Sequence, residues 1–355
     1  MTEVTQEKLN AFVGKMLGDL GGAFSIPTTR IGLRLGLFDA LHRHGPATSK
    51  ELAARTSSGL AERYVREWAM AQAANGYIIF DARENRFSLS PEQAMVFAVK
   101  DSPVYLAGAF DLTAAMIEGE AKVEQAFRDG TGVRWGDSAG CLFCSVGSFF
   151  RPTYVNSIVQ SWIPALDGVE ARLKKGIKVA DIGCGVGFST LLMAKAYPNS
   201  TFVGFDFHEP SIAEAKGHAK CHQSLDNVRF EAAPAKSIRE RDFDLVTMFD
   251  CLHDMGDPRG CAAHMRALLK ADGTWMIVEP ISHNRAEENL NPVGRLYYNA
   301  STMICVPTSL DQEVGEGLGA QAGEPKVTEV VASGGFTRVR RATEGPFNMV
   351  IEARP

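Results

Sequence analysis

The sequence lacks the features that attach a protein to a membrane or send it out of the cell. No run of about 20 apolar residues is present, which is the length that a membrane-spanning helix requires. The first stretch, MTEVTQEKLN, has neither the basic region nor the apolar core of a secretory signal. The seven cysteines are an odd number at irregular spacing and offer no disulfide framework. We therefore expect a cytoplasmic protein with reduced thiols and no membrane partner.

An excess of basic residues is also missing. The chain has 37 Lys and Arg against 42 Asp and Glu, and its formal net charge is -5. Nucleic-acid binding depends on clustered Lys and Arg that neutralise phosphates, so this balance argues against a nucleic-acid partner. What is present suits a folded enzyme: 355 residues, 45% of them hydrophobic, which predicts about two domains.

Residues 1–100 have the pattern of a winged-helix domain. The segment PATS starts a short helix, a second helix is predicted from about Leu60 to Asn75, and the runs YIIF and RFSLS are typical of two short strands. A helix-turn-helix followed by such a strand pair forms a winged helix. Because many winged helices bind DNA, a regulator of transcription is one hypothesis for this chain.

The charge of this segment favours another role. Residues 1–100 contain 12 Lys and Arg against 10 Asp and Glu, and the second helix carries Arg63 and Arg66 beside Glu62 and Glu67. That is no stripe for phosphate binding, and we predict a solvent-exposed face for these arginines. Tyr64 and Trp68 are predicted to pack inward or against a partner subunit. The charge of the domain therefore gives no support to DNA binding.

Residues 101–175 are interpreted as a helical connector that covers the next domain. From residue 176 to 355 apolar strands alternate with helices, which predicts a mostly parallel sheet covered on both faces. The segments TRVRRA and FNMVIEA, near the end of the chain, are expected to form an antiparallel pair at one edge. The fold class is therefore α/β, with a Rossmann-like domain of residues 176–355 behind an α-helical winged-helix domain.

A glycine-rich turn follows the first strand of the sheet, in the stretch VADIGCGVGFST from Val179 to Thr190. Glycines let the backbone approach a ligand closely at the carboxyl ends of parallel strands. A dinucleotide fingerprint would need glycine where Phe188 stands, and a phosphate-binding P-loop would need a lysine well before Lys195. The pattern D-x-G-x-G-x-G differs from both.

This pattern resembles the first motif of the class I S-adenosylmethionine (SAM)-dependent methyltransferases. The next strand, TFVGFD, ends in Asp206, and an acid there suits the two ribose hydroxyls of a nucleoside. The resemblance implies SAM as cofactor. Where relatives carry an adenine-binding aspartate, this chain has Ala233, Pro234 and Ala235. The cofactor residues that the resemblance implies are Asp181, Gly183, Gly185, Gly187, Asp206, Phe207, Phe249 and Asp250.

The segment FDCLHDMGDP, after the fourth strand of the domain, resembles the His-Asp-Trp-Ser-Asp stretch of two-domain O-methyltransferases. The resemblance implies that His253 is a general base, that Asp254 accompanies it and that Glu279, in IVEP, orients it. Histidine suits proton removal from a hydroxyl near neutral pH. Met255 and Gly256 replace the family's Trp and Ser. In the alternatives, His253 and Asp254 cap a helix, or methyl transfer proceeds by proximity alone.

Aromatic and basic residues are the candidates for the acceptor pocket. We predict that it is formed by Phe150, Arg151, Tyr154, Tyr297 and Tyr298. No metal site is expected, because Cys141 and Cys144 have no second ligand pair of comparable spacing.

The resemblance, which extends to the winged helix, therefore implies a bacterial two-domain methyltransferase that dimerises through its N-terminal domain. Such a homodimer would transfer the methyl group of SAM to an oxygen or sulfur of a small molecule, with His253 as base. A small-thiol or sulfide S-methyltransferase that works mainly by proximity, a SAM-sensing winged-helix DNA-binding regulator and an inactive scaffold are the alternatives.

Overall fold

The computed structural model describes residues 4–56, 59–138, 142–221 and 225–355. Contacts between Cα atoms divide the chain into two compact units, Met1–Ala114 and Ala115–Pro355. No helix among the described residues is long and apolar enough to cross a membrane.

The first unit is a winged helix. Its helices are α1 (Gln6–Arg34), α2 (Leu37–His44), α3 (Ser49–Arg55), α4 (Glu62–Ala74) and α5 (Pro91–Phe97), and its strands are β1 (Ile79–Asp81) and β2 (Arg86–Ser88). Thr48 caps α3 and Ser90 caps α5, each through a reciprocal capping box that satisfies two backbone N–H groups. β1 and β2 pair antiparallel as the wing. The predicted helix start at PATS and the strand pair are thus confirmed.

Helix α4 presents two different faces. Trp68 is buried, and its indole N–H donates to the carbonyl oxygen of Thr28 on α1 at 2.9 Å. The exposed arginines pair within the helix, Arg63 with Glu67 and Arg66 with Glu62. Trp68 therefore packs inward as predicted, whereas Tyr64 is 82% exposed and does not.

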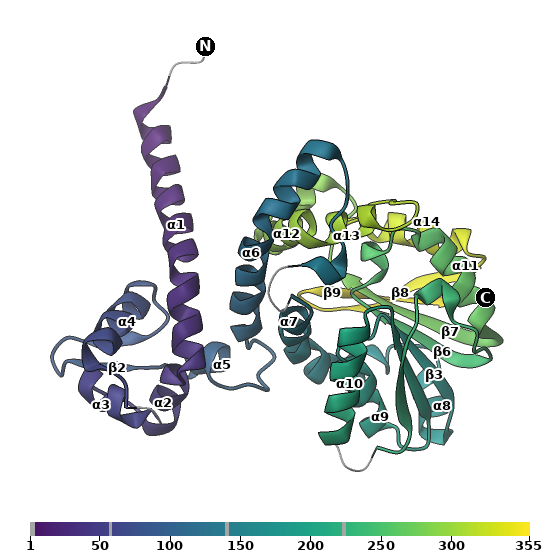
Figure 1. Ribbon diagram of the computed structural model, residues 1–355, viewed down its shortest axis with the longest axis horizontal. Coiled ribbons are helices and arrows are strands. Elements are labelled where there is room, and N and C mark those ends of the chain that lie inside the picture. The colour runs from purple at the N-terminus through teal and green to yellow at the C-terminus, as the bar shows by residue number, and fades with distance from the viewer. Residues whose placement is uncertain (1–3, 57–58, 139–141, 222–224) are drawn as a thin grey trace. The chain divides into compact units, whose positions relative to one another are not determined.

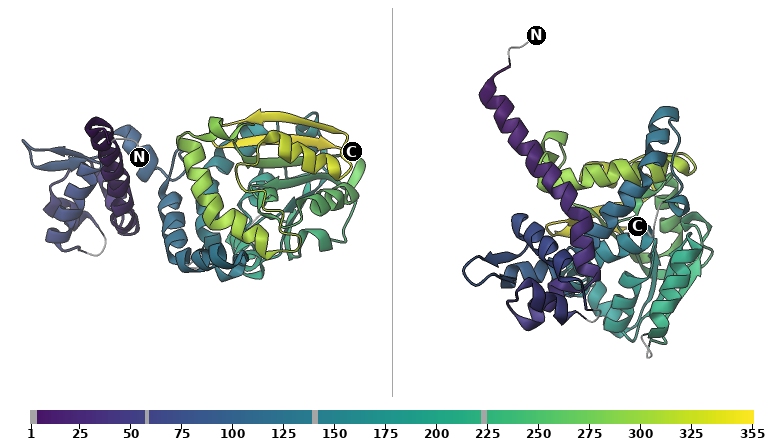
Figure 2. Two further views of the ribbon diagram at one scale, coloured as in Figure 1. Left: turned by 90° about the horizontal axis from the view of Figure 1, so that it is seen from above. Right: turned by 60° about the vertical axis from the view of Figure 1, so that its left-hand side comes forward.

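Helix α1 carries a row of exposed apolar side chains, although helices of water-soluble domains normally bury such residues. Phe12, Leu17 and Phe24 are 60%, 66% and 76% exposed. The helix continues through Pro27. Figure 2 shows it as one long purple ribbon. Its apolar residues are therefore available for contact with another surface.

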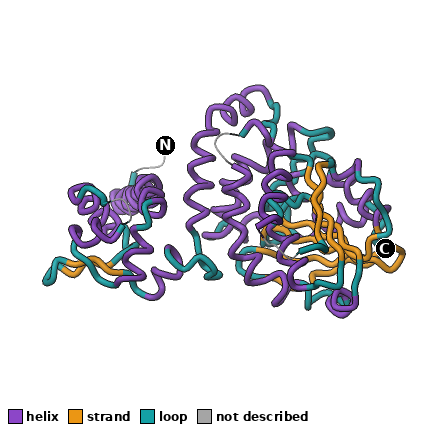
Figure 3. The backbone as a smooth tube through the Cα atoms, turned by 60° about the horizontal axis from the view of Figure 1, so that its bottom comes forward, coloured by secondary structure: helices purple, strands orange, loops and turns teal. Residues whose placement is uncertain are grey.

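The second unit is built on a seven-stranded sheet in the order β5-β4-β3-β6-β7-β9-β8. The strands from β5 to β7 are parallel, and β9 pairs antiparallel with β7 and β8. The predicted fold class, including the antiparallel edge, is confirmed; Figures 1 and 3 show the sheet with helices around it. The strands are β3 (Lys178–Ile182), β4 (Thr201–Asp206), β5 (Val228–Ala232), β6 (Phe243–Phe249), β7 (Leu269–Pro280), β8 (Arg338–Glu344) and β9 (Asn348–Arg354).

Two apolar layers cover the sheet. On one face, Ile182 and Val246 pack with residues of α11 (Pro258–Leu268) and α14 (Glu324–Ser333). On the other face, Val179 and Met276 pack with residues of α9 (Phe188–Ala196) and α8 (Val169–Lys175), while α10 (Glu209–Cys221) packs beside β5. Because both faces are buried, all seven residues of β6 are buried, and its sequence is a continuous apolar run apart from Asp244 and Thr247.

The segment before α8 is largely helical among its described residues. It comprises α6 (Ala107–Asp129), the 3₁₀ turn η1 (Trp135–Asp137), α7 (Leu142–Ser157) and the π-helical turn η2 (Ile158–Trp162) before α8. Further turns and helices follow β5, β6 and β7: η3 (Ala235–Ser237), η4 (Leu252–Asp254), η5 (Ala286–Asn289), α12 (Pro292–Ala300), η6 (Ser301–Cys305) and α13 (Val306–Asp311). Of these segments, η1, α7, η3, η4 and α13 contribute residues to the cavity at the ends of the strands.

Candidate active site

The three glycines of the turn after β3 serve different purposes. All three have positive φ, which favours glycine. A Cβ on Gly187 would lie 2.8 Å from the Phe230 ring, and one on Gly183 would lie 2.7 Å from the sulfur of Cys251. A Cβ on Gly185 would meet nothing within 4 Å. Gly187 and Gly183 thus allow close packing of the protein, whereas Gly185 leaves open space beside the backbone.

Asp181, at the end of β3, stabilises this turn through hydrogen bonds of its buried carboxylate. It is 1% exposed, and its carboxylate accepts hydrogen bonds from the hydroxyls of Ser189 (2.7 Å), Thr190 (2.6 Å) and Thr247 (2.9 Å). Burial raises the pKa of Asp181 to about 6, and the hydroxyls act in the opposite direction. The hydroxyls tie the end of β3 to the first turn of α9 and to β6.

Asp206 ends β4 at the other side of the turn. One carboxylate oxygen accepts from the backbone N–H of Gly185 at 2.9 Å, and the other accepts from that of His208 at 2.8 Å. Burial raises its pKa, opposed by these two hydrogen bonds. The adjacent Phe207 is 51% exposed although it is aromatic. The carboxylate of Asp206, held by two hydrogen bonds, therefore lies next to the solvent-exposed aromatic ring of Phe207.

A cavity of about 510 Å³ lies over this turn. Helix α7 forms one wall through Phe143, Val146, Gly147, Phe150 and Tyr154. A Cβ on Gly147 would come within 2.8 Å of Val186, so this glycine lets α7 pack closely on the glycine turn. The remaining lining comes from the ends of the strands and from α13, and it includes Gly183, Gly185, Asp206, Phe207, Ala233, Pro234, Phe249, Asp250, Asp254, Thr308 and Gln312.

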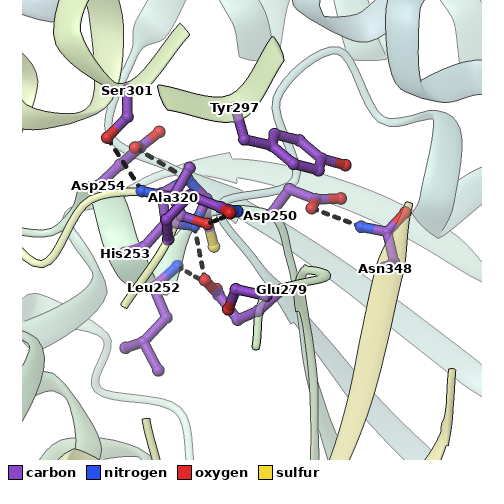
Figure 4. Close-up of polar contacts among 12 residues, drawn as sticks. Asp250, Leu252, His253, Asp254, Glu279, Tyr297, Ser301, Ala320 and Asn348 are labelled. Carbon is purple, nitrogen blue, oxygen red and sulfur yellow. Dashed lines mark hydrogen bonds and ion pairs between the residues drawn. The ribbon is translucent and has the colours of Figure 1, made fainter. Parts of the chain in front are cut away.

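A buried carboxylate, Asp250, stands at the end of β6 in the cavity wall. It accepts a hydrogen bond from the hydroxyl of Tyr154 at 2.9 Å. The side-chain amide of Asn348 also donates to it, at 2.7 Å (Figure 4). Burial raises the pKa of Asp250 to about 8, and the negative charge of Glu279 adds to the shift. Asp250 therefore has a strong tendency to bind a proton or a neighbouring cation.

His253 lies in a cluster with Asp254 and Glu279 (Figure 4) and is not among the residues that line the cavity. Its Nδ1 is 2.6 Å from Oε2 of Glu279, whose Oε1 accepts from the backbone N–H of Leu252 at 3.1 Å. Its Nε2 is 3.1 Å from Oδ1 of Asp254. Burial lowers the pKa of His253, but the carboxylates of Glu279 and Asp254 outweigh burial and hold that pKa well above 6.5.

The loop that carries this cluster is held by α13. The side-chain amide of Gln312 donates to the carbonyl oxygen of Asp254 at 2.9 Å, and the hydroxyl of Ser309 donates to that of Met255 at 2.8 Å. Met255 itself lines the cavity. The loop from Leu252 to Gly256 is therefore fixed in the structure rather than free to adapt.

Some of the residues predicted for the site line the cavity, and others do not. Among the described residues, the lining includes these predicted ones: Gly183, Gly185, Asp206, Phe207, Phe249, Asp250, Asp254, Phe150 and Tyr154. The predicted residues outside the lining are Asp181, Gly187, His253, Glu279, Arg151, Tyr297 and Tyr298. Tyr297 is buried and donates its hydroxyl to the carbonyl of Phe347, and Arg151 lies over the ring of Phe188 at 6.0 Å.

Several lining residues were missed in the sequence. Phe143 and Val146 precede Phe150 and Tyr154 at helical spacing on α7, so an amphipathic pattern was available to find them. Lys236, Thr308 and Gln312 gave no comparable signal. Of the C-x-x-C pair, Cys144 lies on α7 and is disulfide-bonded, so the expectation of reduced thiols is wrong at this position. Cys141 lies outside the described residues.

Two family models match this chain. The model described as "Methyltransferase domain" matches residues 173–330, and the "Rv2258c-like winged HTH domain" matches residues 23–98. Curated relatives include ubiquinone biosynthesis O-methyltransferases of Bordetella avium, 29% identical over 141 residues, and of Thiobacillus denitrificans, 30% identical over 154 residues. These alignments cover 39% and 42% of this chain and 55% and 62% of the relatives, so the chain spans little more than half of their length.

Solved structures resemble the whole chain. The mitomycin 7-O-methyltransferase MmcR has a TM-score of 0.69 at 17% identity, covering 98% of this chain and 100% of its own. Human N-acetylserotonin methyltransferase in complex with SAM has a TM-score of 0.72 at 16% identity, covering 100% and 99%. Taken with the geometry of the glycine turn, these matches confirm the predicted resemblance. Residues 173–330 thus match a methyltransferase domain and residues 23–98 a Rv2258c-like winged-helix domain, and the chain has the fold of the solved two-domain methyltransferases.

Proposed function

We propose that this protein transfers the methyl group of SAM to an oxygen or sulfur atom of a small molecule in the cavity between α7, α13 and the ends of the strands. The observation that carries the proposal is the cavity over the glycine turn, where Gly185 leaves open space and Asp206 stands fixed beside it. SAM supplies an electrophilic methyl group, and the protein aligns the acceptor and excludes water.

The residues of the cavity suit SAM in shape and polarity. Asp206 has acceptor capacity left for ribose hydroxyls, because each of its oxygens receives one backbone hydrogen bond. Phe207 offers an exposed ring to a base, and Ala233 and Pro234 form an apolar wall nearby. No aspartate follows β5, so we propose that backbone groups of this wall recognise the adenine.

The charge of the cavity also suits a cationic cofactor. Its lining contains five acidic residues and one basic residue, Lys236, whose ammonium is paired with Asp257 at 2.5 Å and with Glu313 at 2.6 Å. Burial raises the pKa of Asp250, and a positive charge bound beside it would favour its ionised form. We propose that Asp250 and Tyr154 hold the amino-acid end of SAM.

We propose that the cluster of His253, Asp254 and Glu279 activates the acceptor. Asp254 lines the cavity, so the acceptor's proton would pass first toward Asp254 and His253. His253 favours its protonated form in the structure, and a positive charge bound in the adjoining cavity lowers its pKa again. His253 is then a proton acceptor when the cofactor is bound.

We further propose that the protein is a cytoplasmic homodimer whose winged helix does not bind DNA. The exposed apolar residues of α1 support an assembly surface, and the paired arginines of α4 leave no basic stripe for phosphates.

An acceptor screen with deuterium-labelled methyl SAM tests the activity. Phenols, hydroxy acids, small thiols and hydrosulfide are incubated with the protein, and labelled products are identified by mass. For a hydroxyl acceptor, His253→Ala should lower kcat about 10²–10⁴-fold near neutral pH, whereas a thiol acceptor should keep much of its rate at high pH.

The exposed His283→Ala serves as the matched control and should keep the wild-type rate. Binding of SAM without transfer to any acceptor would instead support an inactive scaffold, and tight, salt-sensitive binding of duplex DNA would support a regulator.

A further inference from the structure

The charged side chains of the cavity restrict the charge of the acceptor that it can hold. Among the described residues, the lining contains one basic side chain and five acidic ones, namely Lys236 and Asp206, Asp250, Asp254, Asp257 and Glu313. Bound SAM carries a net positive charge, so it balances only part of this excess of carboxylates. A molecule that enters beside SAM therefore meets a surface of negative potential.

The basic residue of the lining is already paired with carboxylates. Nζ of Lys236 is 2.5 Å from Oδ2 of Asp257 and 2.6 Å from Oε1 of Glu313. The hydrogen bonds to Asp257 and Glu313 raise the pKa of Lys236, and Lys236 in turn holds the pKa of Asp257 below its usual value. An anion could therefore bind this ammonium group only by displacing one of the two carboxylates.

Other donors that would suit an anion are engaged elsewhere. The side-chain amide of Gln312, in the lining, donates to the backbone carbonyl oxygens of Asp254 and Thr308, at 2.9 and 3.0 Å. Arg151, which the sequence predicted for the acceptor pocket, lies over the ring of Phe188 and is not in the lining. A carboxylate or phosphate group of an acceptor would therefore lose its water without gaining a partner of opposite charge.

Much of the uncharged lining is apolar or aromatic. It includes Trp135, Phe143, Val146, Phe150 and Met255. The ring of Phe150 stacks on that of Tyr154, with centroids 5.7 Å apart and planes 9° from parallel. Aromatic faces bind other apolar rings and attract cations, because their π-electron density is negative. The aromatic wall and the carboxylates thus favour the same kinds of molecule.

Glu313 stands where the cavity opens to solvent. It belongs to the lining although its side chain is 69% exposed, and it lies just after Gln312 at the end of α13. A charged acceptor therefore meets the carboxylate of Glu313 on its way into the cavity, so this residue is placed to influence which charges enter.

We propose that the methyl acceptor is a small apolar molecule that is uncharged or positively charged, and that Glu313 helps to exclude acceptors that carry a carboxylate or phosphate group. This inference rests on the proposed function and deepens it, because it names the class of acceptor for the same cavity. The role of Glu313 is to determine specificity, and it takes no part in the transfer step.

Three phenols of similar shape and different charge test the inference. They are 4-ethylphenol, which is uncharged, tyramine, which is cationic, and 4-hydroxyphenylacetate, which is anionic. Their binding to the full-length protein is measured by calorimetry, with and without a saturating SAM analogue that has an amine in place of the methylated sulfur. Tyramine should bind at least as tightly as 4-ethylphenol, and 4-hydroxyphenylacetate should bind about tenfold more weakly or worse.

Two variants assign the effect to residues. Glu313→Lys should strengthen the binding of 4-hydroxyphenylacetate about tenfold and weaken that of tyramine. Lys236→Met should not weaken the anionic phenol further, because the ammonium group is held by Asp257 and Glu313. The matched control is Glu84→Lys, at an exposed position between β1 and β2, which should behave as the wild type. Thermal melting shows whether each variant folds.

Binding of 4-hydroxyphenylacetate as tight as that of 4-ethylphenol would overturn the inference, as would an anionic phenol whose binding is lost in folded Lys236→Met. Tyramine that binds more weakly than 4-ethylphenol would also overturn it, and so would a failure of all three phenols to bind. Selective binding as expected without methyl transfer to any acceptor would contradict the proposed function alone. Methyl transfer to anionic acceptors as efficient as transfer to uncharged ones would contradict this inference alone.

Discussion

At the residue scale, carboxylates at neighbouring strand ends have different environments and therefore different roles. Asp181 is surrounded by three hydroxyl donors and stabilises the glycine turn. Asp206 is held by two backbone N–H groups at the cavity surface. Asp250 is held by Tyr154 and Asn348 and has a pKa of about 8. The surroundings of each side chain, rather than residue type, decide which one is free to meet a ligand.

The raised pKa of Asp250 predicts how stability depends on pH. The pKa of its carboxyl rises from 3.8 in the unfolded chain to about 8 in the folded protein, so the folded state binds more protons between these values. Its contribution to the free energy of unfolding should fall by about 1.4 kcal/mol per pH unit in this window and be lost above pH 8. Asp250→Asn should remove this part of the slope.

Urea unfolding at pH 6, 7 and 8 measures the difference between Asp250→Asn and the wild type. The exposed Asp272→Asn is the control, since its side chain is 77% exposed. Equal slopes in Asp250→Asn and the wild type would show that Asp250 is ionised in the folded protein.

The sequence was sufficient to predict some of these roles. Asp206 follows a recognisable strand and precedes a helix, so its place at the sheet edge could be inferred. The role of Asp181 could not, because only the fold brings Thr247 to the first turn of α9. The contact between Cys305 and His253 was likewise invisible, since it depends on how η6 packs against η4.

At the element scale, the glycine turn and α7 together form the cavity. The strand-turn-helix pattern of residues 178–196 predicted the turn correctly, because each segment has a strong local signal. Helix α7 was predicted only as part of a helical cover. Its packing on the turn depends on Gly147, and glycine in a helix carries no sign of the partner that it approaches.

Alanine substitutions at Gly187 and Gly185 should distinguish a glycine needed for close packing from one needed for SAM binding. Gly187→Ala places a methyl group 2.8 Å from Phe230 and 2.9 Å from Ala215 at a φ of +82°, so it should cost about 2–4 kcal/mol of stability. Gly185→Ala enters open space at a φ of +52° and should cost only about 1–2 kcal/mol, while it lowers SAM affinity at least tenfold.

Denaturant unfolding and calorimetric titration with SAM measure the two effects on the same preparations. The reverse order, with Gly185→Ala the less stable variant and the tighter binder, would mean that the open space beside Gly185 has no part in cofactor binding.

At the scale of the whole molecule, a winged helix joined to a methyltransferase domain raises the question of what the winged helix contacts. Its arginines on α4 are neutralised by neighbouring glutamates, whereas α1 exposes several large apolar side chains. Burial of apolar surface drives association, so a second copy is the expected partner. The sequence predicted this module from its helix starts and strand pair, but α1 is too weakly amphipathic for its exposed face to be inferred.

We predict that glutamates on α1 dissociate the dimer. The triple variant Phe12→Glu, Leu17→Glu and Phe24→Glu should elute as a monomer in size-exclusion chromatography with light scattering, at concentrations where the wild type is a dimer. Lys8→Glu, a change at an exposed polar position of the same helix, is the control. A wild type that is monomeric throughout, or a triple variant that stays dimeric, would place the assembly surface elsewhere.

The most direct measurement is a calorimetric titration of SAM into the wild type, Asp206→Asn and the control Asp272→Asn. We expect one site per chain with micromolar affinity in the wild type and in Asp272→Asn. Asp206→Asn should bind about 10–100-fold more weakly, because hydrogen bonds to a charged acceptor are worth about 1.5–3 kcal/mol. A wild type that binds no SAM, or an Asp206→Asn variant that binds as tightly as the wild type, would contradict a cofactor site at the glycine turn.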